Sequence, residues 1–421
     1  MSEPIQHTEQ LIDHLFRHQS GKMVAVLSHI AGLKQIHLVE DIVQDTFVNA
    51  LQHWKIKGIP EEPAAWLMQV AKNKAIDLIR RLNYHTRYVQ SQSDVTVTQE
   101  LDSFFHEQEM NDSELRMIFA CCHPSFSKED QVALTLKLVF SFSVGEIARA
   151  LVVSDAAMQK RLIRAKELLK TGDIRLEIPT GKQLQDRLAI VRTILYLLFN
   201  EGYLSHKKEE IIRHDLCMEA IRCTKIITEH PATLNPINDA LLALLCLHAA
   251  RFDSRISDSN ELILLEEQDR NLWDRELIKV GYHYLNRASE KPVISQYHIE
   301  AAIAAEHSMA KDFASTNWSR ILSLYNLLSE ASPAPAVVLN RSIVLSQLGE
   351  TEKAIAQVLS IGGIEQLIRT DHQYASVLGY LYMKLSDRIK ALSYLKQAKS
   401  ITNSPAEQKL LQTRINLISS N

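Results

Sequence analysis

The chain has 421 residues, a formal net charge of −3, and a composition in which 46% of residues are hydrophobic. This length predicts two to four domains, and the near-neutral charge balance means that any basic surface must be local. The longest apolar run, 241–250, is too short to span a bilayer, and the sequence opens on no secretory signal. The five cysteines lack paired metal-ligand spacing, so we expect a cytoplasmic protein with buried, reduced thiols, no metal site and no cofactor.

An acidic stretch with helical spacing covers residues 38–57. Apolar residues such as Val39 and Phe47 recur on one face of the expected helix, which would be buried. An acidic exposed face suits a basic protein partner better than it suits DNA, although a charge run is more commonly just solvated. The polar candidates on that face are Glu40, Asp41, Gln44 and Asp45.

A basic segment with interspersed aromatic residues follows from Pro63 onward. Between residues 72 and 81 four basic side chains stand against the single acid Asp77, a balance that favours contact with single-stranded nucleic acid. Trp66 lies in an apolar pattern, so packing in the core is its expected role. The basic candidates are Lys72, Lys74, Arg80 and Arg81.

Residues 91–112 hold acidic side chains and no lysine or arginine, a composition typical of a solvated flexible linker. Beyond them, two short helices joined by a tight turn are predicted between residues 143 and 170. Ser143 with Glu146 forms a capping box for the first helix, and Ser154 is the expected N-cap of the second.

The second of these helices is apolar on one side and basic on the other. A short helix, a tight turn and a basic helix are typical of a DNA-reading helix-turn-helix, whose second helix enters the major groove. An ordinary helical hairpin with a solvated basic face is the alternative. The side chains expected to point outward are Asp155, Ala156, Gln159, Lys160, Arg161, Arg164 and Lys166.

Together these segments resemble the extracytoplasmic-function sigma factors of the bacterial sigma-70 family. In that family a helix of the form ED-x-x-Q-[DE]-x-F precedes the pattern P-x-AWL-x-x-[IV]-A-[RK]-N-x-A-x-D-x-x-RR, and a recognition helix ends in RL-x-RA[RK]. The chain carries these patterns at residues 40–47, 63–81 and 161–166. Separate motifs in the right order are far more specific than any one of them alone.

The resemblance implies an all-α fold with a region 2 bundle at 1–90, a linker at 91–112 and a region 4 helix-turn-helix at 113–170. The acidic helix would then bind the β′ clamp helices of core RNA polymerase, with the β flap as a further contact. The linker would thread through the RNA-exit channel. Residues 72–81, Asn73 included, would contact the melted promoter −10 element, and the recognition helix would read the −35 element. Binding energy would open the promoter without catalytic residues.

The chain continues far beyond Lys170, and its periodicity predicts helices in a domain at 182–330 and in repeats at 331–421. In the repeats Ala354 aligns with Ala391, an offset of 37 residues, close to the period of tetratricopeptide repeats. Ser386 stands where the matching repeat has a turn glycine, Gly349.

Polar clusters in the middle of the extension invite an enzymatic reading. His248, Glu267, Asp269 and His307 could be assembled into a metal or hydrolytic site, but no ligand or nucleophile spacing supports it, and buried ion pairs and helix contacts are the simpler account. The phrases EGY at 201–203 and QDRNLWD at 268–274 resemble those of sigma factors with a long extension.

We therefore predict an alternative sigma factor with a fused helical module that regulates or supports its activity, so that deleting residues after Lys170 should change transcription. In members with this extension, small proteins of the DGPF or YCII-like type are encoded nearby, which implies a partner of that kind. The first alternative is a one-component helix-turn-helix regulator whose solenoid binds a ligand or partner. The second is an interaction scaffold in which DNA binding is vestigial.

Overall fold

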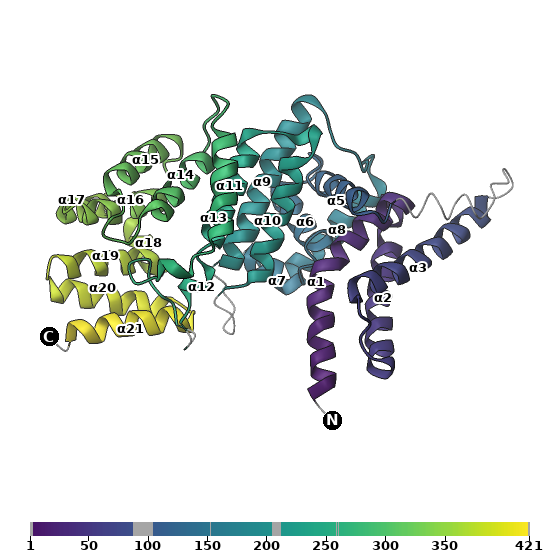
Figure 1. Cartoon of the computed structure of the whole chain (residues 1–421), viewed down its shortest axis with the longest axis horizontal. Helices are drawn as coiled ribbons and strands as arrows, with labels where there is room; N and C mark the ends of the chain where they lie inside the picture. Colours follow the sequence, from purple (N-terminus) through teal and green to yellow (C-terminus); the bar gives the residue numbers. More distant parts are fainter. Residues whose placement is uncertain are drawn as a thin grey trace. The chain divides into compact units, whose positions relative to one another are not determined.

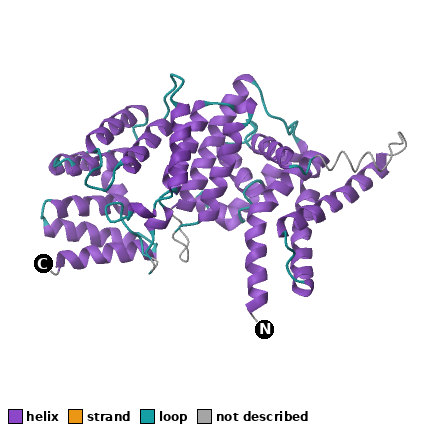
Figure 2. Ribbon diagram, viewed as in Figure 1, coloured by secondary structure: helices purple, strands orange, loops and turns teal. Residues whose placement is uncertain are grey.

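The computed structural model describes residues 3–86, 104–151, 153–203, 212–257, 259 and 261–419. Within these ranges the regular elements are helices, apart from one isolated β-bridge between Ile256 and Leu262 (Figure 2). The predicted all-α fold is confirmed. No described helix is long and apolar enough to cross a membrane. The chain divides into two compact units, residues 1–194 with 230–233, and residues 195–229 with 234–421 (Figure 1).

The N-terminal unit begins with a bundle of three long helices. Its centre is the apolar face of the first helix, where Met23, Val26 and Leu27 are buried. This helix packs against the other two and also against α5, the helix that follows the predicted linker. The elements are α1 (Glu3–Ala31), η1 (Leu33–Gln35), α2 (Ile36–Lys57) and α3 (Pro63–Thr86).

A second set of helices completes most of this unit. Phe119 in α5 is fully buried, as are the adjacent Cys121 and Cys122, and burial raises the pKa of the Cys122 thiol to about 12. The prediction that the thiols are buried is confirmed. The elements are α5 (Glu107–Cys121), α6 (Lys128–Leu138), α7 (Val144–Ala150) and α8 (Asp155–Thr171).

Helix α5 starts earlier than the sequence pattern indicated. It begins at Glu107, inside the segment 91–112 predicted as a linker, of which residues 91–103 lie outside the described residues. Glu107 and Glu109 occupy its first turn, where carboxylates interact favourably with the positive end of the helix dipole. An acidic start to a helix was thus mistaken for the end of an acidic linker.

The two units divide in the middle of one helix, α9 (Gly181–Tyr203), and not at its start, where residue 182 was the predicted boundary. Its first half belongs to the N-terminal unit, where the Arg187 guanidinium donates a 3.2 Å hydrogen bond to the Phe119 carbonyl in α5. A chain cut after Lys170 would therefore lose part of the N-terminal unit as well as the extension.

The first part of the C-terminal unit is built around α11, which packs against α10, α13 and α14. Leu241–Cys246 are almost completely buried, so the apolar run noted in the sequence is a core helix. The elements are α10 (His214–Glu229), α11 (Pro236–Ala249), α12 (Phe252–Arg255), η3 (Arg270–Leu272), α13 (Arg275–Ala288) and α14 (Gln296–Met309). The short η2 (Pro231–Thr233) is assigned to the other unit.

From α14 onward, most helices pack against the next helix in sequence, while α17 packs against α19 beyond the short α18 (Figure 1). Ala354 and Ala391 are fully buried at equivalent places in α17 and α20, and α18 between the two helix pairs accounts for the lengthened period. Gly349 (φ +86°) and Ser386 (φ +60°) both adopt the left-handed conformation, so the serine takes over the turn of the glycine. The elements are α15 (Trp318–Ala331), α16 (Pro335–Gln347), α17 (Thr351–Leu359), α18 (Ile364–Thr370), α19 (His372–Lys384), α20 (Arg388–Ile401) and α21 (Pro405–Ser419).

Candidate nucleic-acid and polymerase interface

The acidic face predicted on α2 is present, with one exception. Asp41, Gln44 and Asp45 are exposed, while Val39 and Phe47 on the opposite face are buried. The exception is Glu40, whose side chain is only 16% exposed because its carboxylate lies 2.5 Å from the ammonium of Lys166 in α8. The expectation that Glu40 lies on the open acidic face was therefore wrong.

Helix α3 presents the candidate residues for single-stranded DNA on its surface. Asn73, Asp77 and Arg80 are exposed, and Asp77 and Arg80 face each other at 3.9 Å on consecutive turns. Lys72 is half-buried, and so is Lys74, whose ammonium lies 3.4 Å from the Asp45 carboxylate. The side chain of Arg81 lies outside the described residues.

Trp66, in the first turns of α3, packs against α2 but is half-buried and does not lie in the core as expected. Its indole meets Trp54 edge-on, with ring centroids 5.5 Å apart, and stacks on the His53 imidazole at the same separation. These contacts hold α3 against α2, so the acidic and basic surfaces are carried by a single packed pair of helices.

Helices α7 and α8 form the predicted helix-turn-helix. The Ser143 hydroxyl accepts a hydrogen bond from the Glu146 backbone N–H, and the Glu146 carboxylate accepts one from the Ser143 backbone N–H, which completes the capping box. Ser154 caps α8 by accepting from the Ala157 N–H. Ala148 in α7 is fully buried, as expected of a small residue in a closely packed pair of helices.

The outward face of α8 carries most of the candidate −35 contacts. Asp155, Ala156, Gln159, Lys160 and Arg164 are exposed, opposite the buried Met158, Leu162, Ala165 and Leu169. Two basic side chains differ from this pattern. Arg161 is half-buried, with its guanidinium 3.7 Å from the Asp130 carboxylate, and Lys166 turns inward to Glu40. Periodicity could not reveal these pairs because both acids belong to other helices.

The α1–α3 bundle and the α5–α8 helices meet at a contact, here called the bundle interface, that includes polar pairs as well as the packing of α1 against α5. It contains the Glu40–Lys166 pair, an ion pair of 3.2 Å between Arg17 and Glu146, and touching hydroxyls of Ser20 and Ser141. A Cβ atom placed on Gly21 would lie 1.8 Å from the Val139 carbonyl oxygen, so only glycine fits there. Glu40, predicted on the acidic face, and Lys166, from the recognition helix, are thus paired with each other at this interface.

A histidine of α1 makes a further polar contact at the bundle interface. His29 Nδ1 lies 2.8 Å from the Ser113 hydroxyl in α5. Burial lowers the pKa of His29, and the nearby Arg116 guanidinium lowers it further. The neutral imidazole is therefore the form that fits this contact.

The four residues that an enzymatic reading would combine lie in two different environments. His248 and His307 are buried in the C-terminal unit, and burial, helped by nearby arginines, lowers the pKa of each to about 3. Glu267 and Asp269 are exposed, and Asp269 caps η3 by accepting a hydrogen bond from the Asn271 N–H. Two neutral core histidines and two surface carboxylates do not form a catalytic pair.

The sequence phrases that marked the extension have structural roles. The Arg270 guanidinium donates to the carbonyl oxygens of His307 (2.5 Å) and Ala310 (2.7 Å), and it lies 5.0 Å from the centre of the Trp273 ring. In the EGY phrase, a Cβ on Gly202 would lie 2.7 Å from the Cys217 sulfur. The predicted packing role is thus observed, whereas Arg270 bonds backbone carbonyls and the Thr316 hydroxyl and not the carboxylate that an ion pair would need.

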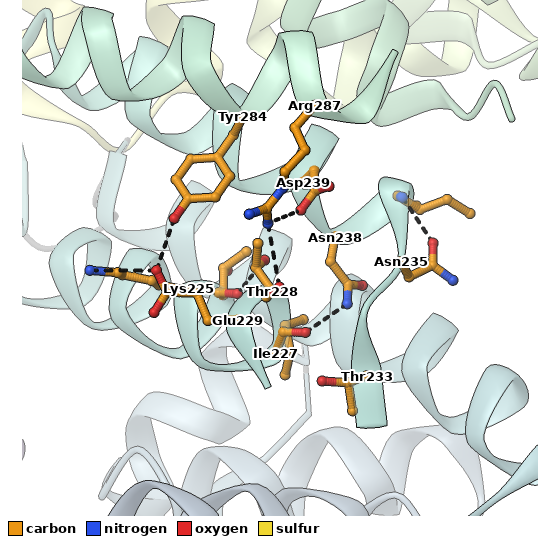
Figure 3. A network of polar contacts seen from close by, with 12 residues as sticks. Lys225, Ile227, Thr228, Glu229, Thr233, Asn235, Asn238, Asp239, Tyr284 and Arg287 are labelled. Carbon is orange, nitrogen blue, oxygen red and sulfur yellow. Dashed lines mark hydrogen bonds and ion pairs between the residues drawn. The ribbon is translucent and has the colours of Figure 1, made fainter. Parts of the chain in front are cut away.

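A polar network that sequence reasoning missed links α10, α11 and α13 (Figure 3). The Arg287 guanidinium donates two hydrogen bonds to the Asp239 carboxylate, at 2.6 and 3.1 Å, and a longer one to the Thr228 carbonyl. The Tyr284 hydroxyl donates to Glu229 at 3.0 Å. Asp239 and Arg287 follow no recognisable motif, so no local pattern pairs them.

Comparison with known protein families gives a match in each part of the chain. The family model for sigma-70 region 2 matches residues 15–84, and the model of a family of unknown function, DUF6596, matches residues 187–289. An uncharacterised protein of Rhizobium meliloti, R00370, is 33% identical over 400 residues, which cover 94% of this chain and 93% of the relative. No solved structure matches the chain significantly.

Characterised relatives match the N-terminal part. The ECF RNA polymerase sigma factor SigL of Mycobacterium tuberculosis is 30% identical over 132 residues, covering 31% of this chain and 72% of SigL. The ECF RNA polymerase sigma factor SigM of Bacillus subtilis is 26% identical over 147 residues, covering 32% of this chain and 80% of SigM.

The helical bundle with its acidic helix, followed by a helix-turn-helix, defines a sigma factor of the sigma-70 class. Within that class the chain belongs to the extracytoplasmic-function family, and it carries a long helical extension that contains the DUF6596 region.

Proposed function

We propose that this sigma factor binds core RNA polymerase through the exposed acidic face of α2, formed by Asp41, Gln44 and Asp45, and so directs initiation at specific promoters. The observation that carries the proposal is the exposure of these side chains on the face of α2 opposite the buried Val39 and Phe47. An acidic surface of this kind steers and orients a basic partner. The expected partner surfaces are the β′ clamp helices and, for the α5–α8 helices, the β flap.

Promoter recognition is assigned to two surfaces. On α3, Asn73, Asp77 and Arg80 are open to a melted −10 strand, with Arg81 expected beside them. On α8, Gln159, Lys160 and Arg164 are open to the major groove of the −35 element, and Asp155 and Ala156 lie near the helix start, which enters a groove first. The linker expected to thread through polymerase is shortened to 91–106 by the start of α5.

The contacts at the bundle interface would have to change when polymerase binds. While Glu40 is paired with Lys166, its carboxylate is not available to polymerase, so we propose that the two sets of helices separate when polymerase binds. The separation gives up this pair and the packing of α1 against α5, so the basic partner surface that replaces Lys166 and the other contacts with polymerase must offset that loss.

The extension is proposed to regulate or support this activity, and a small DGPF- or YCII-like protein stays a predicted partner. A one-component regulator would bind duplex DNA without polymerase, and the acidic face of α2 would then have no use. A scaffold would have no use for the exposed basic side chains of α8.

The test is run-off transcription by the full chain with purified core polymerase. Specific initiation, lost on Asp41→Lys and kept on the charge-matched control Glu365→Lys at an exposed position of α18, supports the proposal. Duplex DNA binding by the chain alone, with no initiation in the presence of core polymerase, would instead support the one-component regulator.

A further inference from the structure

The C-terminal unit contains a cavity of about 330 Å³ between α14, α15, α16, α19, α21 and the segment before η3. Its walls are mainly apolar and include four aromatic side chains, Phe313, Trp318, Tyr325 and Tyr380. A volume of this size lies at the lower end of the range for small-molecule sites, which combine apolar walls with a few convergent polar groups. The cavity has no role in the proposed contacts with polymerase or DNA.

One charged side chain in the cavity wall has no close counter-ion. Arg414 in α21 forms no ion pair or hydrogen bond within the described part of the chain, and its guanidinium lies over the Tyr380 ring, 5.3 Å from the centroid. Glu266 and Glu267 influence Arg414 only from beyond ion-pair distance, and burial lowers its pKa. A guanidinium removed from water without a paired carboxylate favours the arrival of an anion.

Further hydrogen-bonding capacity lies unused around the same cavity. Among the described residues, the Tyr325 hydroxyl and the Asn340 amide make no hydrogen bond, and His307 Nδ1 is buried without a partner. Tyrosine, asparagine and arginine can all donate to a ligand oxygen. The polar groups therefore favour a ligand that brings acceptors, and the aromatic walls favour a ligand with an apolar body.

We propose that this cavity binds a small carboxylic acid with an aromatic or alkyl body, whose carboxylate pairs with Arg414. The body packs against Trp318, Tyr325 and Tyr380, and the donors near the cavity take up the remaining carboxylate lone pairs. Glu266 also lines the cavity and would attract a cation instead, so the sign of the ligand's charge distinguishes the two. This inference goes beyond the proposed function and does not rest on it.

Calorimetric titration of the full chain tests the proposal with three acids, indole-3-acetate, 4-phenylbutyrate and decanoate, each beside its neutral amide. At least one acid should bind, and its amide should bind at least about tenfold more weakly, because a charge-assisted pair with arginine is lost. Arg414→Met should lower the affinity for the acid to the affinity for its amide. Arg414→Lys should restore part of the difference in affinity between the acid and the amide.

Arg388→Met, on the exposed surface of α20, is the matched control and should leave the affinity for the acid unchanged. Thermal unfolding of each variant establishes that it is folded. The proposal is overturned if no acid binds, if the amides bind as tightly as the acids, or if folded Arg414→Met keeps the affinity of the native chain. Because the titration contains no polymerase, its failure leaves the sigma-factor proposal untouched.

Discussion

Two ion pairs between distant helices show how differently the two units are held together. In the N-terminal unit Glu40 and Lys166 meet through a single contact between a carboxylate and an ammonium. In the C-terminal unit Asp239 receives two hydrogen bonds from Arg287, which also bonds the Thr228 carbonyl and lies 4.7 Å from the centre of the Tyr284 ring.

The two pairs differ in how readily the basic side chain can exchange its carboxylate partner. A lysine ammonium on a flexible stem can exchange one carboxylate for another, whereas the planar fork of arginine fixes its partner geometrically. The Glu40–Lys166 pair is thus suited to the exchange of partners proposed for polymerase binding, and the network around Arg287 is suited to keep its helices together.

The largest effect is expected from a covalent lock on the bundle interface. The touching hydroxyls of Ser20 and Ser141 make Ser20→Cys with Ser141→Cys a candidate disulfide pair, and the five native cysteines are buried. Oxidation should lower run-off transcription at least about a hundredfold, since the helices can no longer separate, and reduction should restore it. Ser20→Cys alone is the control. Full activity of the verified disulfide would show that opening is not required.

The network around Arg287 should respond to the loss of one charge. Asp239→Asn leaves the guanidinium half-buried without its counter-ion, and the free energy of unfolding should fall by about 2–4 kcal/mol. Glu276→Gln is the comparison, because Glu276 pairs with Lys279 on an exposed surface and should contribute less than about 1 kcal/mol. Denaturant unfolding measures both, and equal losses would remove the contrast between a buried network and a surface pair.

Acid should destabilise the C-terminal unit through its buried histidines. The pKa of His248 and of His307 is lowered to about 3 in the folded chain, so the fold favours the neutral form. This stability is fully present above the ordinary histidine pKa near 6.5 and is lost as pH falls toward 3, by up to about 1.4 kcal/mol per pH unit for each histidine.

The pH dependence can be assigned by substitution. Denaturant unfolding between pH 7 and pH 4 should show a shallower fall in the free energy of unfolding for His248→Gln than for the native chain. His283→Gln, at an exposed position of α13, should leave the slope unchanged. An unchanged slope in His248→Gln would mean that this histidine is not kept neutral by the fold.

The smallest effect is expected at the pair that shields Glu40. Lys166→Gln removes the counter-ion of a mostly buried carboxylate, which favours the separated helices and should raise affinity for core polymerase about two- to fivefold. Lys182→Gln, exposed at the start of α9, is the matched control for the loss of a positive charge. Weaker binding by Lys166→Gln would show that Lys166 supports the complex instead of competing with it.

Sequence patterns correctly predicted the structural features that depend only on residues close together in the chain. The capping box at Ser143 and the buried face of α8 follow from local spacing, and both are observed. The pairing of Glu40 with Lys166 could not be predicted, because periodicity tells which face of a helix is polar but not which distant side chain lies opposite.

The boundaries of helices and units likewise could not be predicted from local sequence alone. The start of α5 at Glu107 was missed because carboxylates suit both an acidic linker and a helix N-terminus. The division of α9 between two units was missed because both halves of the helix are equally amphipathic, and only the Arg187 contact shows where the first half belongs. The cavity beside Arg414 depends on five helices and the segment before η3, and no single segment indicates it.

The most direct test of the central claim is run-off transcription with core polymerase, comparing the native chain with Asp41→Lys. The account predicts initiation at a specific site by the native chain and a loss of at least about tenfold with Asp41→Lys, because a reversed charge on the exposed face of α2 repels the polymerase surface it should bind. Equal activity of the two chains would contradict the assignment of α2 as the polymerase-binding helix, and no initiation by either would contradict the sigma-factor function itself.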